Sequence, residues 1–294
     1  MTTTPARRLP PWIRARLSAG GAFATVNSTL EHGDLHTVCQ SALCPNRHEC
    51  FSRGTATFMI LGAVCTRKCA FCAVTTGAPG PLDPDEPARV AGAAKELGLG
   101  HVVVTSVTRD DLADGGASVF AGVIQALRRE MPAATVEVLV PDFRGNAGDI
   151  ATVLAAGPDV LNHNLETVRR LQQQIRSGAN YETSLSVLRQ AAAWLPAVAV
   201  KSGLMVGLGE TDEEIHEAMQ DLFASGCRLL TIGQYLAPSP QHRPVDRYVE
   251  PERFDGYRAD ALAMGFVAVA AAPLVRSSYE AGHLLAAARM ARTA

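Results

Sequence analysis

From residue 57 onward, short continuous apolar runs alternate with longer stretches that have helical periodicity. The apolar runs predict buried strands, and the periodic stretches predict amphipathic helices. The expected strands are 57–63, 101–107, 135–140, 159–162, 197–205 and 229–235, and the clearest helices are 86–97, 116–130 and 212–225. Strands that are apolar throughout and separated by helices are typical of parallel βα units. The pattern therefore predicts an α/β fold, a partial or open (β/α)6 barrel of parallel strands.

The segments on either side of this alternation look different. Residues 1–55 are irregular, apart from a short helical piece near 26–30, and they form an expected N-terminal extension. The predicted barrel occupies 56–265. Residues 266–294 form an expected C-terminal extension, in which 266–271 could add a short strand and a helix begins near 279.

Polar residues gather where several predicted strands end. Ser106, Asn162, Asn164 and Glu166 follow or close such strands, and Lys201 interrupts another. Active sites of parallel α/β folds lie at the carboxyl ends of the strands. We therefore expect these five residues to contact a cofactor, although each could instead cap a helix or support a loop.

Composition excludes several classes of function. The chain has 294 residues and a formal net charge of −2, so nothing indicates nucleic-acid binding. No apolar run approaches the roughly 20 residues that a membrane helix requires. The basic start of the chain has no apolar core after it, unlike a secretory signal. The cytoplasm is the expected compartment.

Cysteine usage adds the first specific chemistry. The chain has seven cysteines, and six of them lie between positions 39 and 72. Disulfide frameworks belong to short secreted chains, whereas clustered cysteines in a long chain of the cytoplasm, the compartment expected here, indicate metal.

The segment CTRKCAFC places Cys65, Cys69 and Cys72 in a C-x3-C-x2-C spacing directly after the first strand. Three thiolates leave one iron of a four-iron cluster open, and the amine and carboxylate of S-adenosylmethionine can occupy it. Structural zinc usually takes four protein ligands, so it fits this spacing poorly. The spacing, with Phe71 before the last cysteine, is the signature of the radical S-adenosylmethionine superfamily.

The segment CQSALCPNRHEC places Cys39, Cys44 and Cys50 in a C-x4-C-x5-C spacing ahead of the barrel. These three thiolates would hold a second cluster, whose fourth iron is either open or bound by another residue type. Cys227 lies at the wrong end of a strand and is expected to be a buried small hydrophobe. His48 lies within the motif, and a serine is also possible as a harder, weaker ligand.

Taken together, residues 11–281 resemble the lipoyl synthase family. The resemblance rests on the two cysteine motifs and on TSVTRDDLADGGASVF, VPDFRG, NHNLET, KSGLMVGLGET, TIGQYLAPS, PVDRYV and PLVRSSYEA. Two departures are small: Gln40-Ser41 stand where an acidic residue is common, and Ala271-Ala272 precede Pro273 where a small residue and a glycine are usual.

The resemblance implies two [4Fe–4S] clusters and S-adenosylmethionine as cofactors. The cluster of Cys65, Cys69 and Cys72 would cleave S-adenosylmethionine to a 5′-deoxyadenosyl radical. The auxiliary cluster would be held in the terminal extensions by the first three cysteines and a serine, Ser278 rather than Ser277, and would be consumed as sulfur donor. Arg276 would steady that cluster or pair with a carboxylate.

The family inserts two sulfur atoms, at carbons six and eight, into an octanoyl chain carried on a lysine of a partner protein. The partner would be an octanoylated lipoyl carrier domain or a glycine-cleavage carrier protein, and a reductant such as ferredoxin or flavodoxin would supply electrons. Such carriers tend to be acidic. A basic docking patch is one hypothesis and a solvated helix face is the other for Arg243, Arg247, Arg253 and Arg258.

Three other functions share some of these features. A methylthiotransferase or biotin-synthase-like enzyme would carry the Cys65 motif without both the N-terminal cysteine motif and RSSY. An electron-transfer or cluster-carrier protein would not need polar strand ends. A structural zinc protein would be colourless.

Overall fold

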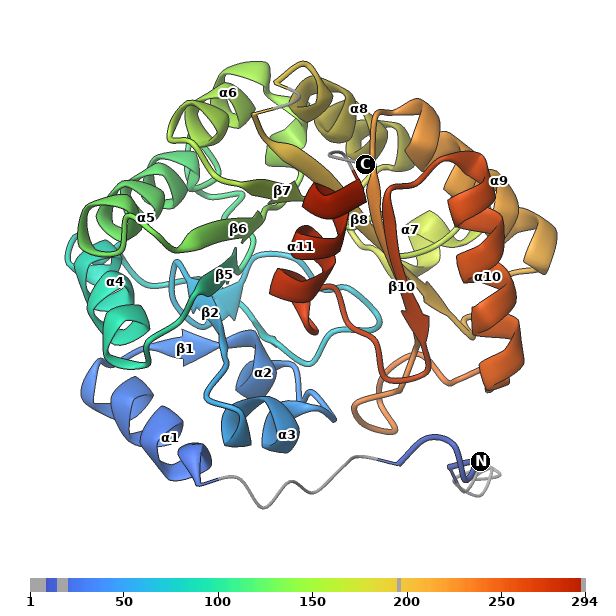
Figure 1. Ribbon diagram of the computed structural model, residues 1–294, viewed down its shortest axis with the longest axis horizontal. Coiled ribbons are helices and arrows are strands. Elements are labelled where there is room, and N and C mark those ends of the chain that lie inside the picture. The colour runs from blue at the N-terminus through green and yellow to red at the C-terminus, as the bar shows by residue number, and fades with distance from the viewer. Residues whose placement is uncertain (1–8, 15–20, 195–196, 292–294) are drawn as a thin grey trace.

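The computed structural model describes residues 9–14, 21–194 and 197–291. In these ranges the main sheet has eight strands in the order β1-β2-β5-β6-β7-β8-β9-β10 (Figure 1). The strands are β1 (His36–Thr37), β2 (Thr57–Ile60), β5 (His101–Ser106), β6 (Thr135–Leu139), β7 (Val160–Asn162), β8 (Ala199–Val206), β9 (Leu229–Gln234) and β10 (Ala268–Ala272). β1 pairs with β2 in antiparallel orientation, and all other neighbours are parallel.

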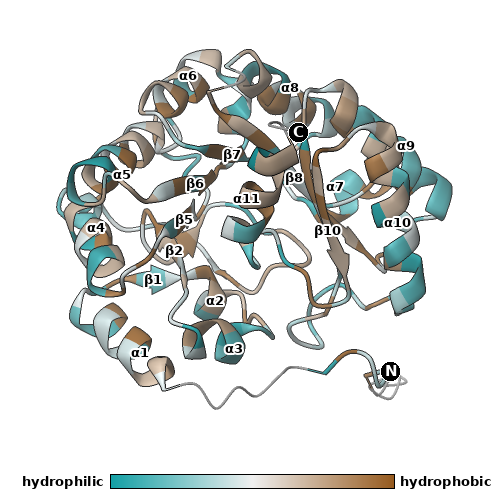
Figure 2. Ribbon diagram, viewed as in Figure 1, coloured by the Kyte–Doolittle hydropathy of each residue, from teal (hydrophilic) through white to brown (hydrophobic). Residues whose placement is uncertain are grey.

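Helices connect the parallel strands and cover the outside of the curved sheet (Figure 1). They are α4 (Glu86–Glu96), α5 (Ala117–Glu130), α6 (Ala147–Ala155), α8 (Tyr181–Ala192), α9 (Asp212–Ala224) and α10 (Pro251–Met264). Their hydrophobic sides face brown, apolar strands in Figure 2, and their outer sides carry the teal residues. The predicted partial (β/α)6 barrel is confirmed, and the possible strand at 266–271 is β10, a further parallel strand.

The ends of the chain pack onto this barrel. Helices α1 (Ala22–His32), α2 (Val38–Ser41) and α3 (Arg47–Ser52) lie beside β1, and the expected helical piece at 26–30 is part of α1. Val26 and Phe51 belong to the same hydrophobic core as the barrel strands. The predicted division at residues 55 and 265 stays a prediction.

Helix α11 (Ala281–Ala291) lies across the middle of the ring of strands (Figure 1). Its Leu284 and Ala288 pack against Leu229 and Ala268 at the amino ends of β9 and β10. The helix therefore covers the end of the barrel opposite the carboxyl ends of the strands. None of the helices in the described ranges is long and apolar enough to cross a membrane.

Short elements complete the described chain. β3 (Val64–Cys65) and β4 (Thr75–Thr76) form a separate two-stranded parallel sheet. The others are η1 (Phe143–Gly145), η2 (Arg169–Leu171) and α7 (Gln172–Ile175).

A buried ion pair joins β6 and β8. Lys201 Nζ donates to Glu137 Oε1 at 2.8 Å, and both side chains are at most 1% exposed. Asn162 Nδ2 donates to the same oxygen at 3.1 Å, and His101 Nε2 lies 3.6 Å from Glu137 Oε2. Burial alone would raise the pKa of Glu137, but the charge of Lys201 and the contact with His101 outweigh it and lower that pKa. The carboxylate is therefore ionised and paired.

We expect Lys201→Met to lower the free energy of unfolding by about 3–5 kcal/mol, because it leaves a buried carboxylate without its cation. Urea unfolding under anaerobic conditions measures the loss. Glu137→Gln/Lys201→Met is the control, since the amide keeps an acceptor for Asn162 and removes the charge. A double variant as unstable as Lys201→Met would contradict this account of the pair.

Candidate functional site

One cavity of about 940 Å³ lies inside the barrel. Its volume is within the roughly 300–1,000 Å³ typical of ligand sites. Both cysteine motifs contribute all three of their cysteines to its lining: Cys39, Cys44, Cys50, Cys65, Cys69 and Cys72. Two motifs that are separate in sequence therefore face the same space.

The motif of Cys65, Cys69 and Cys72 forms the loop between β3 and β4. Cys65 ends β3 and pairs with Thr76 of β4, which ties the two ends of the loop together. The backbone N–H groups of Arg67 and Thr108 each lie 3.4 Å from Cys65 Sγ and donate to it. The N–H of Cys72 donates to the carbonyl of Cys69 at 3.1 Å. These bonds fix the backbone from which the three thiols project.

Arg67 anchors this loop to the ends of two strands. Its guanidinium contacts Asp110 and Asp142 at 2.7 Å each, and its side chain is only 9% exposed. Burial would raise the pKa of Asp142, but the hydrogen bonds and charge of Arg67 outweigh it and lower that pKa. Paired, charge-assisted hydrogen bonds of this kind are among the stronger polar contacts in proteins.

The motif of Cys39, Cys44 and Cys50 folds compactly beside β2. Cys39 lies in α2 and is buried, Cys50 lies in α3, and Cys44 is in the turn between them. The N–H of Cys44 donates to the carbonyl of Cys39 at 3.1 Å. Burial raises the pKa of Cys50 to about 12, and the neighbouring Cys39 and Cys44 contribute to the rise. All three thiols line the same cavity.

Burial also raises the pKa of Cys69 to about 12 and that of Cys72 to about 11. Thiols with such values are protonated at neutral pH, and a bound metal is the usual partner that stabilises their thiolates. All seven cysteines are free. Soft thiolates in a mostly apolar cavity fit iron–sulfur chemistry. As they stand, no three His, Cys, Asp or Glu side chains of the described residues form a group that could hold a metal ion.

Three of the five predicted cofactor contacts line the cavity: Ser106, Asn164 and Glu166. Asn164 Nδ2 donates to Glu166 Oε1 at 3.1 Å. Burial raises the pKa of Glu166, although the positive charge of Arg176 opposes the rise. The oxygen atoms Ser106 Oγ and Asn164 Oδ1 are buried without a hydrogen-bond partner among the described residues. Both oxygens are therefore available to a bound molecule.

The structure does not bring Asn162 and Lys201 to this group. Both are fully buried, are absent from the cavity lining and contact Glu137. Their role as cofactor contacts stays a prediction, while the contacts that they make are structural.

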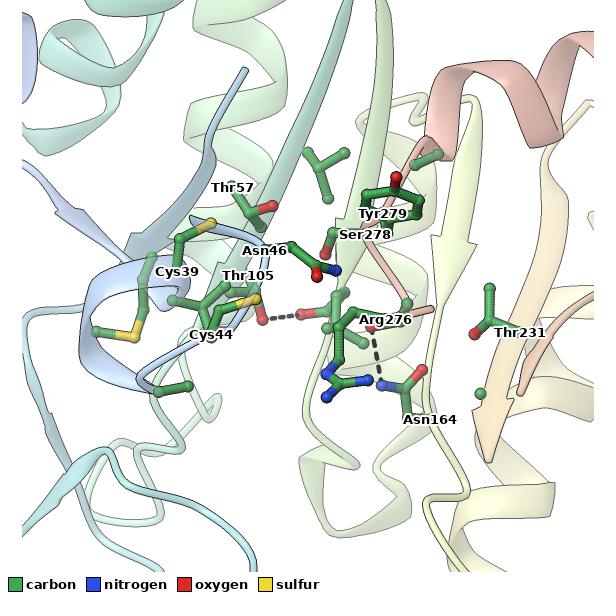
Figure 3. A pocket seen from close by; sticks show the side chains of 18 of the residues that line it. Cys39, Cys44, Asn46, Thr57, Thr105, Asn164, Thr231, Arg276, Ser278 and Tyr279 are labelled. Carbon is green, nitrogen blue, oxygen red and sulfur yellow. Dashed lines mark hydrogen bonds between the residues drawn. The ribbon is translucent and has the colours of Figure 1, made fainter. Parts of the chain in front are cut away.

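The RSSY segment also lines the cavity. Ser277 Oγ accepts a hydrogen bond from Asn164 Nδ2 at 3.1 Å. Within the described chain the hydroxyl of Ser278 has no such bond, and in Figure 3 Ser278 lies across from Cys39 and Cys44. Figure 3 also shows the guanidinium of Arg276 between Cys44 and Asn164, where Arg276 Nη1 donates to the carbonyl of Val275 at 2.6 Å.

Two arginines of the site escaped the sequence analysis. Arg67 is inside the CTRKC motif, so its position could have been a signal. Arg176 follows α7, outside every motif, and donates to the carbonyl of Asn164 and to Ser184 Oγ at 3.0 Å each. Nothing in its local sequence indicates that it reaches the cavity.

Cys227, His48 and two arginines of the hypothetical docking patch have ordinary structural contacts. Cys227 is fully buried, as expected. The ring of His48 stacks on Phe23 with 5.0 Å between centroids. Of the proposed basic patch, Arg247 and Arg253 both pair with Asp212, at 2.8 and 2.9 Å. The negative charge of Asp212 partly neutralises these two arginines, which weakens their attraction to an acidic carrier.

Comparison with known proteins identifies the family. The Radical SAM superfamily matches residues 59–222. The lipoyl synthase of Nitratidesulfovibrio vulgaris (strain Hildenborough) is 54% identical over 95% of this chain and 93% of its own. The lipoyl synthase of Dechloromonas aromatica is 55% identical over 94% and 88%, and that of Symbiobacterium thermophilum is 52% identical over 97% and 89%.

Solved structures support the fold. Methylornithine synthase superposes with a TM-score of 0.58 at 14% identity, over 86% of this chain and 71% of its own. A maturase of the [FeFe]-hydrogenase superposes with a TM-score of 0.57 at 14% identity, over 79% and 54%. The sequence relatives, the shared fold and the two cysteine motifs lead to one conclusion: the chain belongs to the lipoyl synthase family of the radical SAM superfamily.

Proposed function

We propose that Cys65, Cys69 and Cys72 hold the cluster that binds S-adenosylmethionine, and that the auxiliary cluster is bound by Cys39, Cys44, Cys50 and Ser278. As a lipoyl synthase, the chain uses two [4Fe–4S] clusters and S-adenosylmethionine to insert two sulfur atoms into an octanoyl chain. One observation carries the residue assignment: both cysteine sets line the same cavity. An acyl chain inside that cavity can meet both clusters without leaving it.

When bound, the cluster of Cys65, Cys69 and Cys72 and S-adenosylmethionine supply radicals that abstract hydrogen from carbons six and eight, and the auxiliary cluster supplies sulfide. The protein's own residues orient these groups. Arg67 and its two aspartates hold the Cys65 loop at the rim of the barrel. Unactivated carbon–hydrogen bonds offer no acid–base handle, so positioning is the main task of the side chains.

The polar end of the cavity suits S-adenosylmethionine. Asn164, Glu166 and Ser106 are hydrogen-bonding groups for its ribose and amino acid portions, and the orphaned oxygens of Asn164 and Ser106 support this assignment. Arg176 is a cation for its carboxylate, since it lines the cavity and contacts the carbonyl of Asn164 at 3.0 Å.

The remaining wall suits the acyl chain. Met59, Val103, Leu139 and Leu204 bring apolar side chains from four different strands into the lining. Burying a methylene group in such surroundings stabilises the complex by about 0.8 kcal/mol. An apolar wall also keeps water away from a carbon radical, which supports the placement of carbons six and eight here.

The substrate is an octanoylated carrier, and the reaction needs a reductant. We propose a lipoyl carrier domain or a glycine-cleavage carrier protein as the carrier, and ferredoxin or flavodoxin as the reductant. Cysteines that hold clusters must stay reduced, and none of the seven is in a disulfide, so we propose that the reaction takes place in the cytoplasm.

Ser278→Ala should abolish sulfur insertion and weaken the auxiliary cluster, because it removes the fourth ligand. Ser277→Ala is the matched control, since Ser277 already accepts a bond from Asn164. Product formation and Mössbauer spectra of the reconstituted proteins measure both effects. The opposite ranking, with Ser277→Ala the inactive variant, would transfer the ligand role to Ser277.

The proposed function is tested by anaerobic reconstitution followed by turnover with dithionite, S-adenosylmethionine and an octanoyl-lysine peptide. We expect about eight irons per chain from two four-iron clusters, release of 5′-deoxyadenosine and a dithiolated peptide. Cys50→Ala should keep 5′-deoxyadenosine release and lose sulfur insertion, whereas Cys65→Ala should lose both. Wild-type protein with about four irons and no sulfur in the peptide would exclude the auxiliary site.

A further inference from the structure

The chain between β10 and α11, residues 273–280, is here called the C-terminal strap. It crosses the cavity wall and carries Ser278. At its start it runs against β9, where a Cβ on Gly233 would overlap the carbonyl of Val275. Glycine at 233 therefore allows the strap to enter the barrel closely.

The strap is tied to residues 39–50, here called the cysteine segment, by side chains that have no assigned cofactor role. Asn46 Nδ2 donates to the carbonyl of Leu274 at 2.6 Å. The hydroxyl of Tyr279 donates to Glu49 Oε1 at 3.2 Å. Asn46 and Glu49 lie between Cys44 and Cys50, and Tyr279 follows Ser278 directly. The two ties therefore lie on either side of the proposed serine ligand.

Arg53 adds a third tie at the surface. Its guanidinium contacts Glu49 Oε1 and Glu280 Oε1, both at 2.8 Å. The side chain of Glu49 is 6% exposed, whereas those of Arg53 and Glu280 are nearly half exposed. The exposed pair contributes little because solvent screens it. The bond of Tyr279 ends on the buried carboxylate, where solvent competes less, and it ties the residue next to Ser278 to the segment between Cys44 and Cys50.

We propose that Asn46, Glu49 and Tyr279 are positioning residues that latch the strap onto the cysteine segment and hold Ser278 toward the auxiliary site. This inference rests on the proposed role of Ser278. A serine oxygen is a weaker partner for iron than a thiolate. A ligand of this kind depends on a scaffold that holds it in place, and the latch supplies that scaffold from inside the two motifs that carry the ligands.

Tyr279→Phe removes one hydroxyl and keeps the ring, so it tests the latch with little change in packing. In the reconstituted holoprotein we expect iron release to a ferrous chelator to be about five- to tenfold faster, as the loss of one hydrogen bond of ordinary strength predicts. Hydrogen–deuterium exchange of strap amides should accelerate as well. Formation of 5′-deoxyadenosine without substrate should stay within about twofold of wild type, because the latch does not reach the Cys65 loop.

Tyr181→Phe is the matched control. Its hydroxyl also donates to a carboxylate, Asp221 Oδ2 at 2.9 Å, but on the outside of the barrel between α8 and α9. It should leave iron release and strap exchange unchanged. Faster release in Tyr181→Phe as well would mean a general loss of stability, and would overturn the latch.

Ser278→Ala separates failure of this inference from failure of the proposed function. If Ser278→Ala releases iron at the wild-type rate, Ser278 is not the ligand and both ideas fall. If Ser278→Ala is fast but Tyr279→Phe is slow, only the latch falls. If the latch acts through Ser278, the double variant should release iron no faster than Ser278→Ala alone, because the two changes then share one mechanism.

Discussion

The functional site depends on a sheet that does not close. In the described chain, β1 and β10 are the two edges of the sheet. The seven strands from β2 to β10 are parallel to one another. Closed eight-stranded barrels fill their interior with side chains. Here the open curve leaves a cavity, and Gly203 on β8 and Gly233 on β9 let Asn164 and the C-terminal strap approach these strands closely. The N-terminal segment adds the edge strand β1 and the motif of Cys39, Cys44 and Cys50, and the C-terminal strap brings RSSY to the same cavity.

Charged pairs then fix the parts that packing alone would not. At the rim, Arg67 holds the Cys65 loop to Asp110 and Asp142. Deeper in the barrel, Lys201 and Glu137 join β6 and β8. Both pairs are largely removed from water, so each would be costly to break on one side only. The cavity between them can therefore remain apolar while its walls keep a defined shape.

The strands and helices of the barrel could be predicted from the sequence, because strands that are buried on both faces appear as unbroken apolar runs. The same signal was absent for β1, β3 and β4, which have only two residues each. The cysteine motifs were recognisable because ligand spacing is local. How deep a residue lies in the barrel depends on distant parts of the chain, so the local sequence does not indicate it. Asn162 and Lys201 contact Glu137 and do not line the cavity. Ser277 and Ser278 are adjacent, so only the tertiary contact with Asn164 separates them.

Both cysteine motifs line one cavity, so the two clusters should lie close to each other. Electron paramagnetic resonance of the fully reduced protein tests this directly, because neighbouring paramagnets couple. We expect a wild-type spectrum with spin–spin splitting that the summed spectra of Cys50→Ala and Cys65→Ala cannot reproduce. A wild-type spectrum equal to that sum would place the clusters too far apart to share a substrate chain, and the two motifs would then not serve one active site.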